Sequence, residues 1–146
     1  MTRALGLVLA GVTLLATIPS PARAQSKWRE EVTAQVDHAA KLLKERGYTK
    51  TDIYDGSLDQ DASESLTLPL RAGRQYAILG VCDVDCNNLD LRLYGGADKE
   101  LDSDVEADDV PVVMITPDHD GKFRLKITMT KCESSPCFYG IGLFVK

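Results

Sequence analysis

Acidic residues gather in the middle of this sequence, where their density suggests a cation site. Twelve acidic residues lie between Asp83 and Asp120, against two basic ones. Calcium binds six to eight carboxylate and carbonyl oxygens at once, so acidic loops that meet in the fold could hold it. Calcium is the one cofactor that the sequence suggests, and its candidate ligands are Asp83, Asp85, Asp90, Asp102 and Asp104. The alternative is that acidic loops cap turns and keep the chain soluble.

The second group of residues that could do chemistry is a set of four cysteines: Cys82, Cys86, Cys132 and Cys137. An even number of cysteines in an exported chain indicates two disulfides. We favour the local pairs Cys82–Cys86 and Cys132–Cys137, because each pair brackets a short turn-like segment. A zinc site with four thiolate ligands is the alternative, since the Cys-x3-Cys and Cys-x4-Cys spacings lie near those of zinc ligands.

Signs of catalysis are weak in this sequence. The two histidines lie far apart, with His38 on the polar side of an expected helix and His119 in an expected turn. The Gly-x-Ser-x-Gly and His-Glu-x-x-His motifs are absent, and oxidised cysteines are not nucleophiles. Clustered carboxylates without an apolar pocket are poor acid–base catalysts. We therefore expect a non-catalytic protein, with a small hydrolase that uses carboxylates of residues 83–109 as the enzymatic alternative.

The N-terminus has the three parts of a secretory signal peptide. Arg3 precedes an uncharged apolar run over residues 4–18, and Ala22-Arg23-Ala24 is a small-x-small cleavage site. We expect a signal peptide over residues 1–24 and a periplasmic or secreted protein. The alternative is an uncleaved membrane anchor, but the apolar run is shorter than the roughly 20 residues that a bilayer span requires. No later apolar stretch is long enough to span a bilayer, so we expect no membrane span after cleavage.

The remaining chain is acidic. Residues 25–146 hold 15 basic and 22 acidic residues, a net charge of −7. A nucleic-acid partner would require a basic face for its phosphates. We therefore expect a protein or polysaccharide partner and no nucleic acid.

An N-terminal helix is predicted over residues 26–46, within a segment that we delimit as 25–47. One helical stripe carries its apolar residues: Trp28, Val32, Val36, Ala39 and Leu43. Gly47 is the expected stop signal. This helix either packs on its own domain or docks a partner.

Residues 48–64 are polar and predict a connector, with a short edge strand at residues 51–54 as an option. From residue 65 onward, apolar residues alternate with polar ones and predict seven strands. Their ranges are 66–70, 75–81, 89–94, 100–105, 110–116, 123–129 and 138–145. Pro69 places the first at a sheet edge, and the apolar segment 110–116 predicts a central or buried strand. Seven short strands without intervening helices favour an antiparallel β-sandwich.

The C-terminal half resembles the bacterial pre-peptidase C-terminal (PPC) domain family. The resemblance rests on Asp85 and on the following segments: Leu70-Arg71-Ala72-Gly73-Arg74-Gln75-Tyr76, Leu89-Asp90-Leu91-Arg92-Leu93-Tyr94, Asp102 with Asp104, 112–117, 121–125 and 139–143. It implies a jelly-roll-like sandwich that assists secreted proteases in export, substrate targeting or matrix binding, with calcium in members similar to collagen-binding domains. The N-terminal helix and the four cysteines depart from the family pattern.

The sequence thus predicts a mainly β protein, in which one N-terminal α-helix precedes a jelly-roll-like antiparallel β-sandwich of the PPC type over residues 65–146. Its predicted function is that of a non-catalytic exported binding or accessory module, which calcium would stabilise. The alternative is an envelope-associated structural protein whose N-terminal helix docks a partner.

Overall fold

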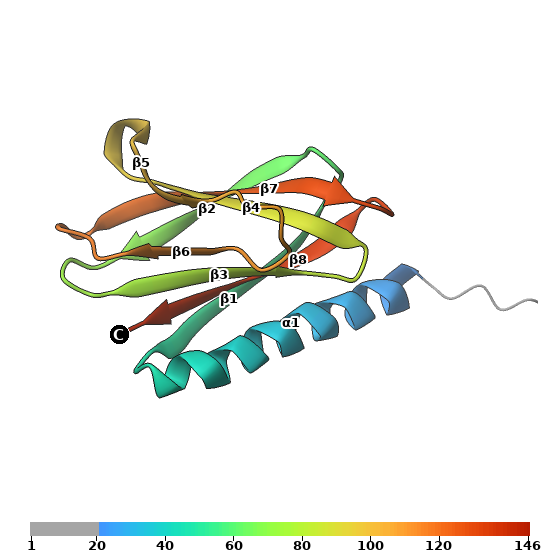
Figure 1. Ribbon diagram of the computed structural model, residues 1–146, viewed down its shortest axis with the longest axis horizontal. Helices are drawn as coiled ribbons and strands as arrows, with labels where there is room; N and C mark the ends of the chain where they lie inside the picture. The colour runs from blue at the N-terminus through green and yellow to red at the C-terminus, as the bar shows by residue number, and fades with distance from the viewer. Residues whose placement is uncertain (1–20) are drawn as a thin grey trace, which may run out of the picture.

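The computed structural model describes residues 21–146, in which one helix packs on a sandwich of two four-stranded sheets (Figure 1). Helix α1 (Pro21–Glu45) begins before the expected start at residue 26. Residues 1–20 of the predicted signal peptide, which spans residues 1–24, lie outside the described residues. Within residues 21–146, no helix has both the length and the hydrophobicity to cross a membrane.

Every neighbouring pair of strands in the two sheets is antiparallel. The first sheet has the order β1 (Thr49–Leu58), β8 (Cys137–Val145), β3 (Tyr76–Cys82) and β6 (Val112–Ile115). The second has the order β2 (Ser63–Leu70), β7 (Gly121–Cys132), β4 (Cys86–Tyr94) and β5 (Glu100–Asp104). A short 3-10 turn, η1 (Gly96–Asp98), joins β4 to β5. This strand order is that of a jelly roll, so the predicted fold class is confirmed.

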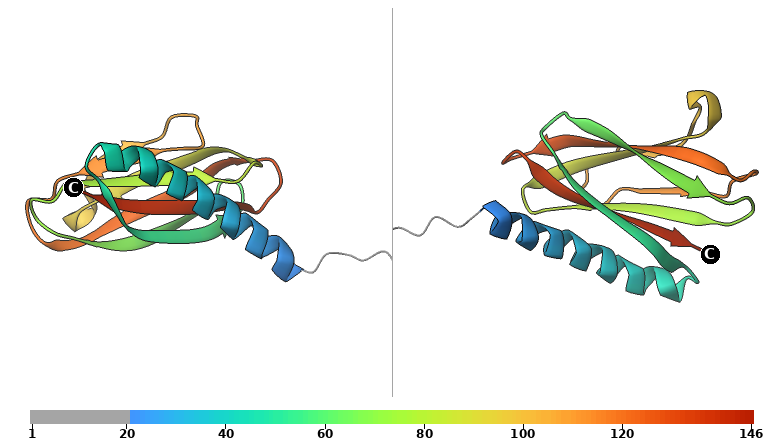
Figure 2. Two further views of the ribbon diagram at one scale, coloured as in Figure 1. Left: turned by 90° about the horizontal axis from the view of Figure 1, so that it is seen from below. Right: turned by 180° about the vertical axis from the view of Figure 1, so that it is seen from behind.

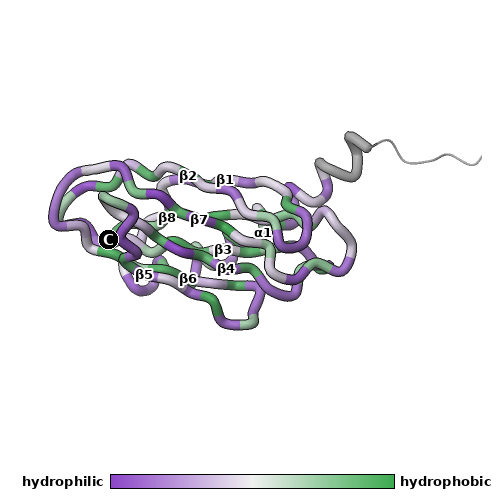
Figure 3. Tube along the Cα trace, turned by 90° about the horizontal axis from the view of Figure 1, so that it is seen from above, coloured by the Kyte–Doolittle hydropathy of each residue, from purple (hydrophilic) through white to green (hydrophobic). Residues whose placement is uncertain are grey.

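The core between the sheets comes from alternate residues of the central strands. Along β7 the side chains of Phe123, Leu125, Ile127 and Met129 are buried, while the residues between them are at least partly exposed. Hydrophobic and hydrophilic stretches follow one another along the chain trace (Figure 3). The period-two pattern of the sequence therefore marks the faces of these strands correctly.

Helix α1 lies across the outer face of the first sheet (Figure 2). Val32 and Val36 are buried in a second apolar cluster, together with residues of β3 and β8 and with Tyr48. Gly47 ends the helix with a positive φ of 87°. Its N–H bonds to the Lys44 carbonyl and the Tyr48 N–H bonds to the Leu43 carbonyl, which together form a Schellman motif. The predicted apolar stripe thus packs on the protein's own sheet.

Two parts of the strand prediction differ from the structure. Residues 48–64, predicted as a connector with an optional edge strand at residues 51–54, contain the longer edge strand β1, which pairs with β8 from Thr49 to Leu58. β1 is polar, lies at a sheet edge and has an irregular register between Lys50 and Asp52, so its alternation is weak. The segment 110–116, predicted to be a central or buried strand, forms β6 at the other edge, with Val113 buried and with Val112 and Met114 exposed. β2, which carries Pro69, lies at an edge as expected.

Candidate functional site

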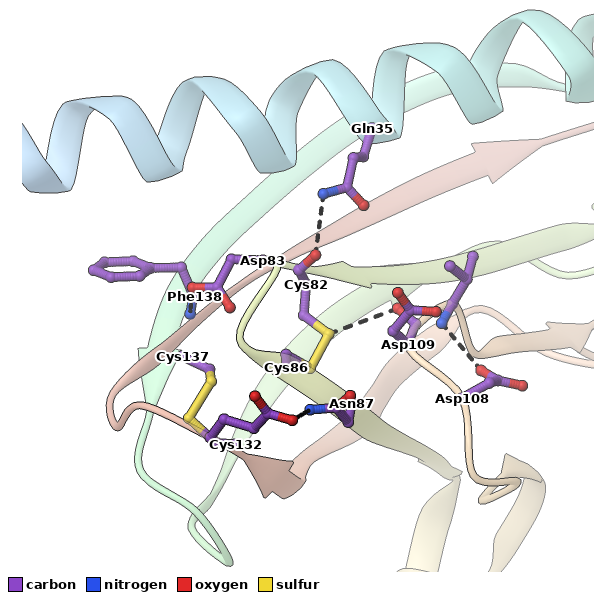
Figure 4. The surroundings of a disulfide bond; sticks show 12 residues. Gln35, Cys82, Asp83, Cys86, Asn87, Asp108, Asp109, Cys132, Cys137 and Phe138 are labelled. Carbon is purple, nitrogen blue, oxygen red and sulfur yellow. Dashed lines mark hydrogen bonds between the residues drawn. A yellow bond between two sulfur atoms is a disulfide. The ribbon is translucent and has the colours of Figure 1, made fainter.

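Both disulfides lie at one end of the sandwich (Figure 4). Cys82–Cys86 closes the β3–β4 turn and Cys132–Cys137 closes the β7–β8 turn, which is the local pairing that the spacing favours. The two bridges are neighbours because Cys86 and Cys132 are register partners across β4 and β7. All four thiols are thereby used, and the described residues contain no free cysteine.

Hydrogen bonds join the turns at this end. The Glu133 N–H donates to the Asp85 carbonyl at 2.8 Å, and the Asn87 side-chain amide donates to the Glu133 carboxylate at 2.9 Å. From the β1–β2 turn, the Gln60 N–H donates to the Ser135 hydroxyl at 3.1 Å. The disulfides and these bonds hold three turns in one arrangement.

Asp83 is the one buried charged side chain among the described residues, with 3% of its surface exposed. One carboxylate oxygen, Oδ2, accepts the Phe138 N–H at 2.8 Å, and the Asp83 N–H donates to the Phe138 carbonyl at 3.0 Å. Burial raises the pKa of the Asp83 carboxyl, and the nearby Asp85 and Glu31 raise it further, against the lowering effect of the Phe138 hydrogen bond. Asp83 thus anchors β8 to the end of β3.

Asp102 and Asp104 close the seam between the two sheets. Both residues pair with inward-facing leucines of β4 and therefore share the inward face of β5. Asp104 Oδ2 accepts the Val112 N–H at 2.8 Å, and Asp102 Oδ2 accepts the Met114 N–H at 2.7 Å. Because β6 is an edge strand, these N–H groups have no neighbouring strand to bond, and the carboxylates satisfy them.

The five calcium candidates are therefore spread over separate parts of the fold. Asp83 lies at the end of β3, Asp85 in the β3–β4 turn, and Asp90 on β4 opposite Thr128 of β7. Asp102 and Asp104 are engaged at the β5–β6 seam. Within residues 21–146, no three His, Cys, Asp or Glu side chains are grouped to hold a metal ion. The structure thus does not support a calcium site formed by these residues.

An apolar groove lies beside the disulfide end, between α1 and the β6 edge of the first sheet. It has a volume of about 570 Å³, and we call it the α1–β6 groove. Its apolar lining is Ala34, Ala39, Leu42, Leu79, Val81 and Val110. Leu42 and Val110 are 56% and 44% exposed. Exposed apolar surface of this kind is typical of interaction sites and ligand-binding grooves.

The apolar surface continues from the groove onto β6. Val112 is the register partner of Leu79, and Met114 that of Ala77, so their side chains share the outer face of the sheet. Helix α1 packs on β8, β1 and β3 and leaves Val112 and Met114 exposed at 37% and 44%. The groove and the outer face of β6 thus form one apolar strip.

Comparison with known proteins gives a likeness of fold. No family model and no curated protein matches the chain, so the resemblance to PPC domains stays an interpretation of the sequence. Among solved structures, the chain is similar to PliG of Aeromonas hydrophila, a periplasmic lysozyme inhibitor of g-type lysozyme. The TM-score is 0.50 and the identity 9%, over 65% of this chain and 85% of that one. At this identity the likeness shows a shared fold.

The α1–β6 groove was not predicted from the sequence. Leu42 lies outside the apolar stripe of α1, and this off-stripe leucine was a signal for a second apolar face. Val110, Val112 and Met114 belong to the segment 110–116, which the sequence predicts to be a central or buried strand. The edge position of β6 exposes Val112 and Met114.

Proposed function

We propose that this protein is an exported, non-catalytic binding protein that contacts a protein partner through the α1–β6 groove. The observation that carries the proposal is the open apolar strip formed by Leu42, Val110, Val112 and Met114 on an acidic chain. The two disulfides and the predicted signal peptide support export.

The inhibitor class is the specific form of this proposal. PliG is an inhibitor of a g-type lysozyme, and the jelly roll of this chain could present a surface to a cell-wall hydrolase in the same compartment. Titration of a purified g-type lysozyme with the purified protein, followed by turbidity of a cell-wall suspension, tests this form. Full lysozyme activity at a large molar excess of the protein would refute the inhibitor form of the proposal.

The contact surface is tested in the exporting cell. A photo-crosslinking amino acid placed at Leu42 should join the protein to its partner, whereas the same amino acid at Val84 should not. Val84 is 74% exposed at the disulfide end and does not line the groove.

The affinity of the identified pair is then measured with Leu42→Asp and with the control Val84→Asp. We expect at least a tenfold weaker Kd, or about 1.4 kcal/mol, for Leu42→Asp alone. Equal affinities of the two variants would refute the groove as the contact surface.

The alternative is an envelope-associated structural protein in which α1 itself docks the partner. The stripe of α1 that contains Val32 and Val36 is buried against the protein's own sheet. A partner that docks on α1 would therefore meet its groove side, where Leu42 and His38 lie. Crosslinking at Leu42 to an envelope-bound protein would favour this alternative over a soluble partner.

A further inference from the structure

We infer that the partner segment held by the α1–β6 groove is an amphipathic helix, with an apolar face bordered by lysine or arginine side chains. This inference rests on the proposed function, because it names the chemistry of the partner at the same groove. It draws on three observations: the apolar strip, the occupied edge of β6 and the charges around the groove.

The edge of β6 indicates how the partner binds. An extended peptide usually joins a sheet by bonding to the free N–H and C=O groups of an edge strand. At β6 the outward N–H groups of Val112 and Met114 already donate to Asp104 and Asp102. Strand addition would have to displace two carboxylates. We therefore expect the partner to bind through side-chain contacts and not by adding a strand to β6. An apolar groove between a helix and a sheet suits an amphipathic helix.

The charges at the groove determine the flanks of that helix. Glu31 is the acidic residue in the groove lining, which contains no lysine or arginine. The opposite wall carries Val110, and the loop leading to it carries Glu106, Asp108 and Asp109. An apolar segment flanked by basic side chains therefore complements the groove, whereas acidic flanks would be repelled.

The same charges argue against a second copy of this chain as the occupant. Two copies would bring the acidic loop 105–109 and Glu31 of each towards those of the other, and each chain carries a net charge of −7 over residues 25–146. We expect the protein to sediment as a monomer at micromolar concentration. A dimer that the Leu42→Asp substitution dissociates would overturn the inference.

Two matched helical peptides test the charge preference. Both carry leucines on one face, and the flanking positions are lysine in one and glutamate in the other. We expect the lysine peptide to bind the full protein at least ten times more tightly at low salt, measured by fluorescence anisotropy. In 0.5 M NaCl the ratio should shrink, because salt screens charges at the surface. Equal affinities at low salt would overturn the inference.

Protein variants then locate the bound peptide. The double variant Glu31→Lys/Asp109→Lys should lose most of the tenfold preference, while Asp59→Lys/Glu64→Lys, with the same change in net charge at β2 and the β1–β2 turn, should keep it. Leu42→Asp should weaken the lysine peptide at least tenfold. Equal loss in both double variants, or no loss in Leu42→Asp, would overturn the inference.

The identified partner protein separates the two proposals. If its affinity depends on Leu42 but is unchanged in Glu31→Lys/Asp109→Lys, the groove is the contact surface and the inferred basic flank is wrong. If its affinity is also unchanged in Leu42→Asp, the proposed function at this groove fails.

Discussion

At the scale of single residues, the aspartates of this chain serve the fold in different ways. Asp83 is buried and accepts a hydrogen bond from the Phe138 N–H. Asp102 and Asp104 instead accept hydrogen bonds from backbone N–H groups at the edge of β6. In the sequence these residues are similar aspartates in one acidic region. Their separate roles follow from burial and from which backbone groups lie within reach.

Asp83 should make stability depend on pH. Because burial raises the pKa of its carboxyl, the folded state holds the proton more tightly than the unfolded chain does. The resulting stabilisation is present below the ordinary pKa of an aspartate and is lost as the pH rises through the raised value. Asp83→Asn removes this titration and keeps an oxygen for the Phe138 N–H.

Urea unfolding of the wild type and of Asp83→Asn at several pH values between 3 and 8 measures this effect. As the pH rises, the wild type should lose free energy of unfolding relative to Asp83→Asn, so the difference between the two should change in favour of the variant. The exposed Asp59→Asn serves as the control and should follow the wild type. Parallel curves for the wild type and Asp83→Asn would contradict the prediction.

Asp102 and Asp104 should contribute both to stability and to protection of the β6 edge. Asp102→Ala and Asp104→Ala should each lower the free energy of unfolding by about 1–2 kcal/mol, because each leaves a backbone N–H of β6 without its acceptor. The double variant should also self-associate at high concentration, since it has an open edge. The exposed Asp109→Ala should change stability by less than about 0.5 kcal/mol. Chemical unfolding measures the stability, and size-exclusion chromatography measures self-association. If the double variant behaves like Asp109→Ala, Asp102 and Asp104 do not stabilise and protect the β6 edge.

At the scale of elements, two glycines of β8 let α1 approach the sheet. A Cβ at Gly142 would lie 2.8 Å from Val36 and 2.7 Å from the Phe144 ring, and one at Gly140 would lie 3.2 Å from Val32. The outer face of β8 therefore carries no side chain at these two positions, where the helix crosses it. This explains how a helix with small and branched apolar residues packs closely on β8.

Gly142→Val should displace α1. The added side chain overpacks the interface, so we expect a loss of about 1–3 kcal/mol in the free energy of unfolding. Trp28 stacks on Phe138 with ring centroids 6.0 Å apart and is the one tryptophan in the chain, so its emission should shift to the red. Gly96→Ala is the control, since a Cβ there meets nothing within 4 Å. An unshifted emission in Gly142→Val would show that α1 tolerates the change.

At the scale of the whole molecule, the two disulfides and the packing of the two sheets stabilise the fold. The candidate carboxylates lie apart and several of them already accept hydrogen bonds. We therefore expect the same Tm in calcium as in chelator. A ligand that binds the folded state raises stability by RT ln(1 + [L]/Kd), so a calcium-specific rise in Tm, absent with magnesium, would refute this expectation.

Several features of the molecule could be predicted from the sequence because they depend on local order along the chain. The alternation of Phe123, Leu125, Ile127 and Met129 predicts β7 with its correct inward face. The four- and five-residue cysteine separations favour the two local bridges. The stripe that includes Val32 and Val36, followed by Gly47, predicts the buried face of α1 and its end.

The tertiary structure decided what depends on long-range neighbours. β1 is a strand because β8, far along the chain, supplies its hydrogen bonds, and its own polar residues carry little signal. β6 lies at an edge because the jelly-roll order places nothing beyond it in its sheet, which exposes Val112 and Met114 and brings Asp102 and Asp104 to its N–H groups. The candidate site arises in the same way: α1 covers β3 but not β6, and the groove between them exists only once the helix has packed.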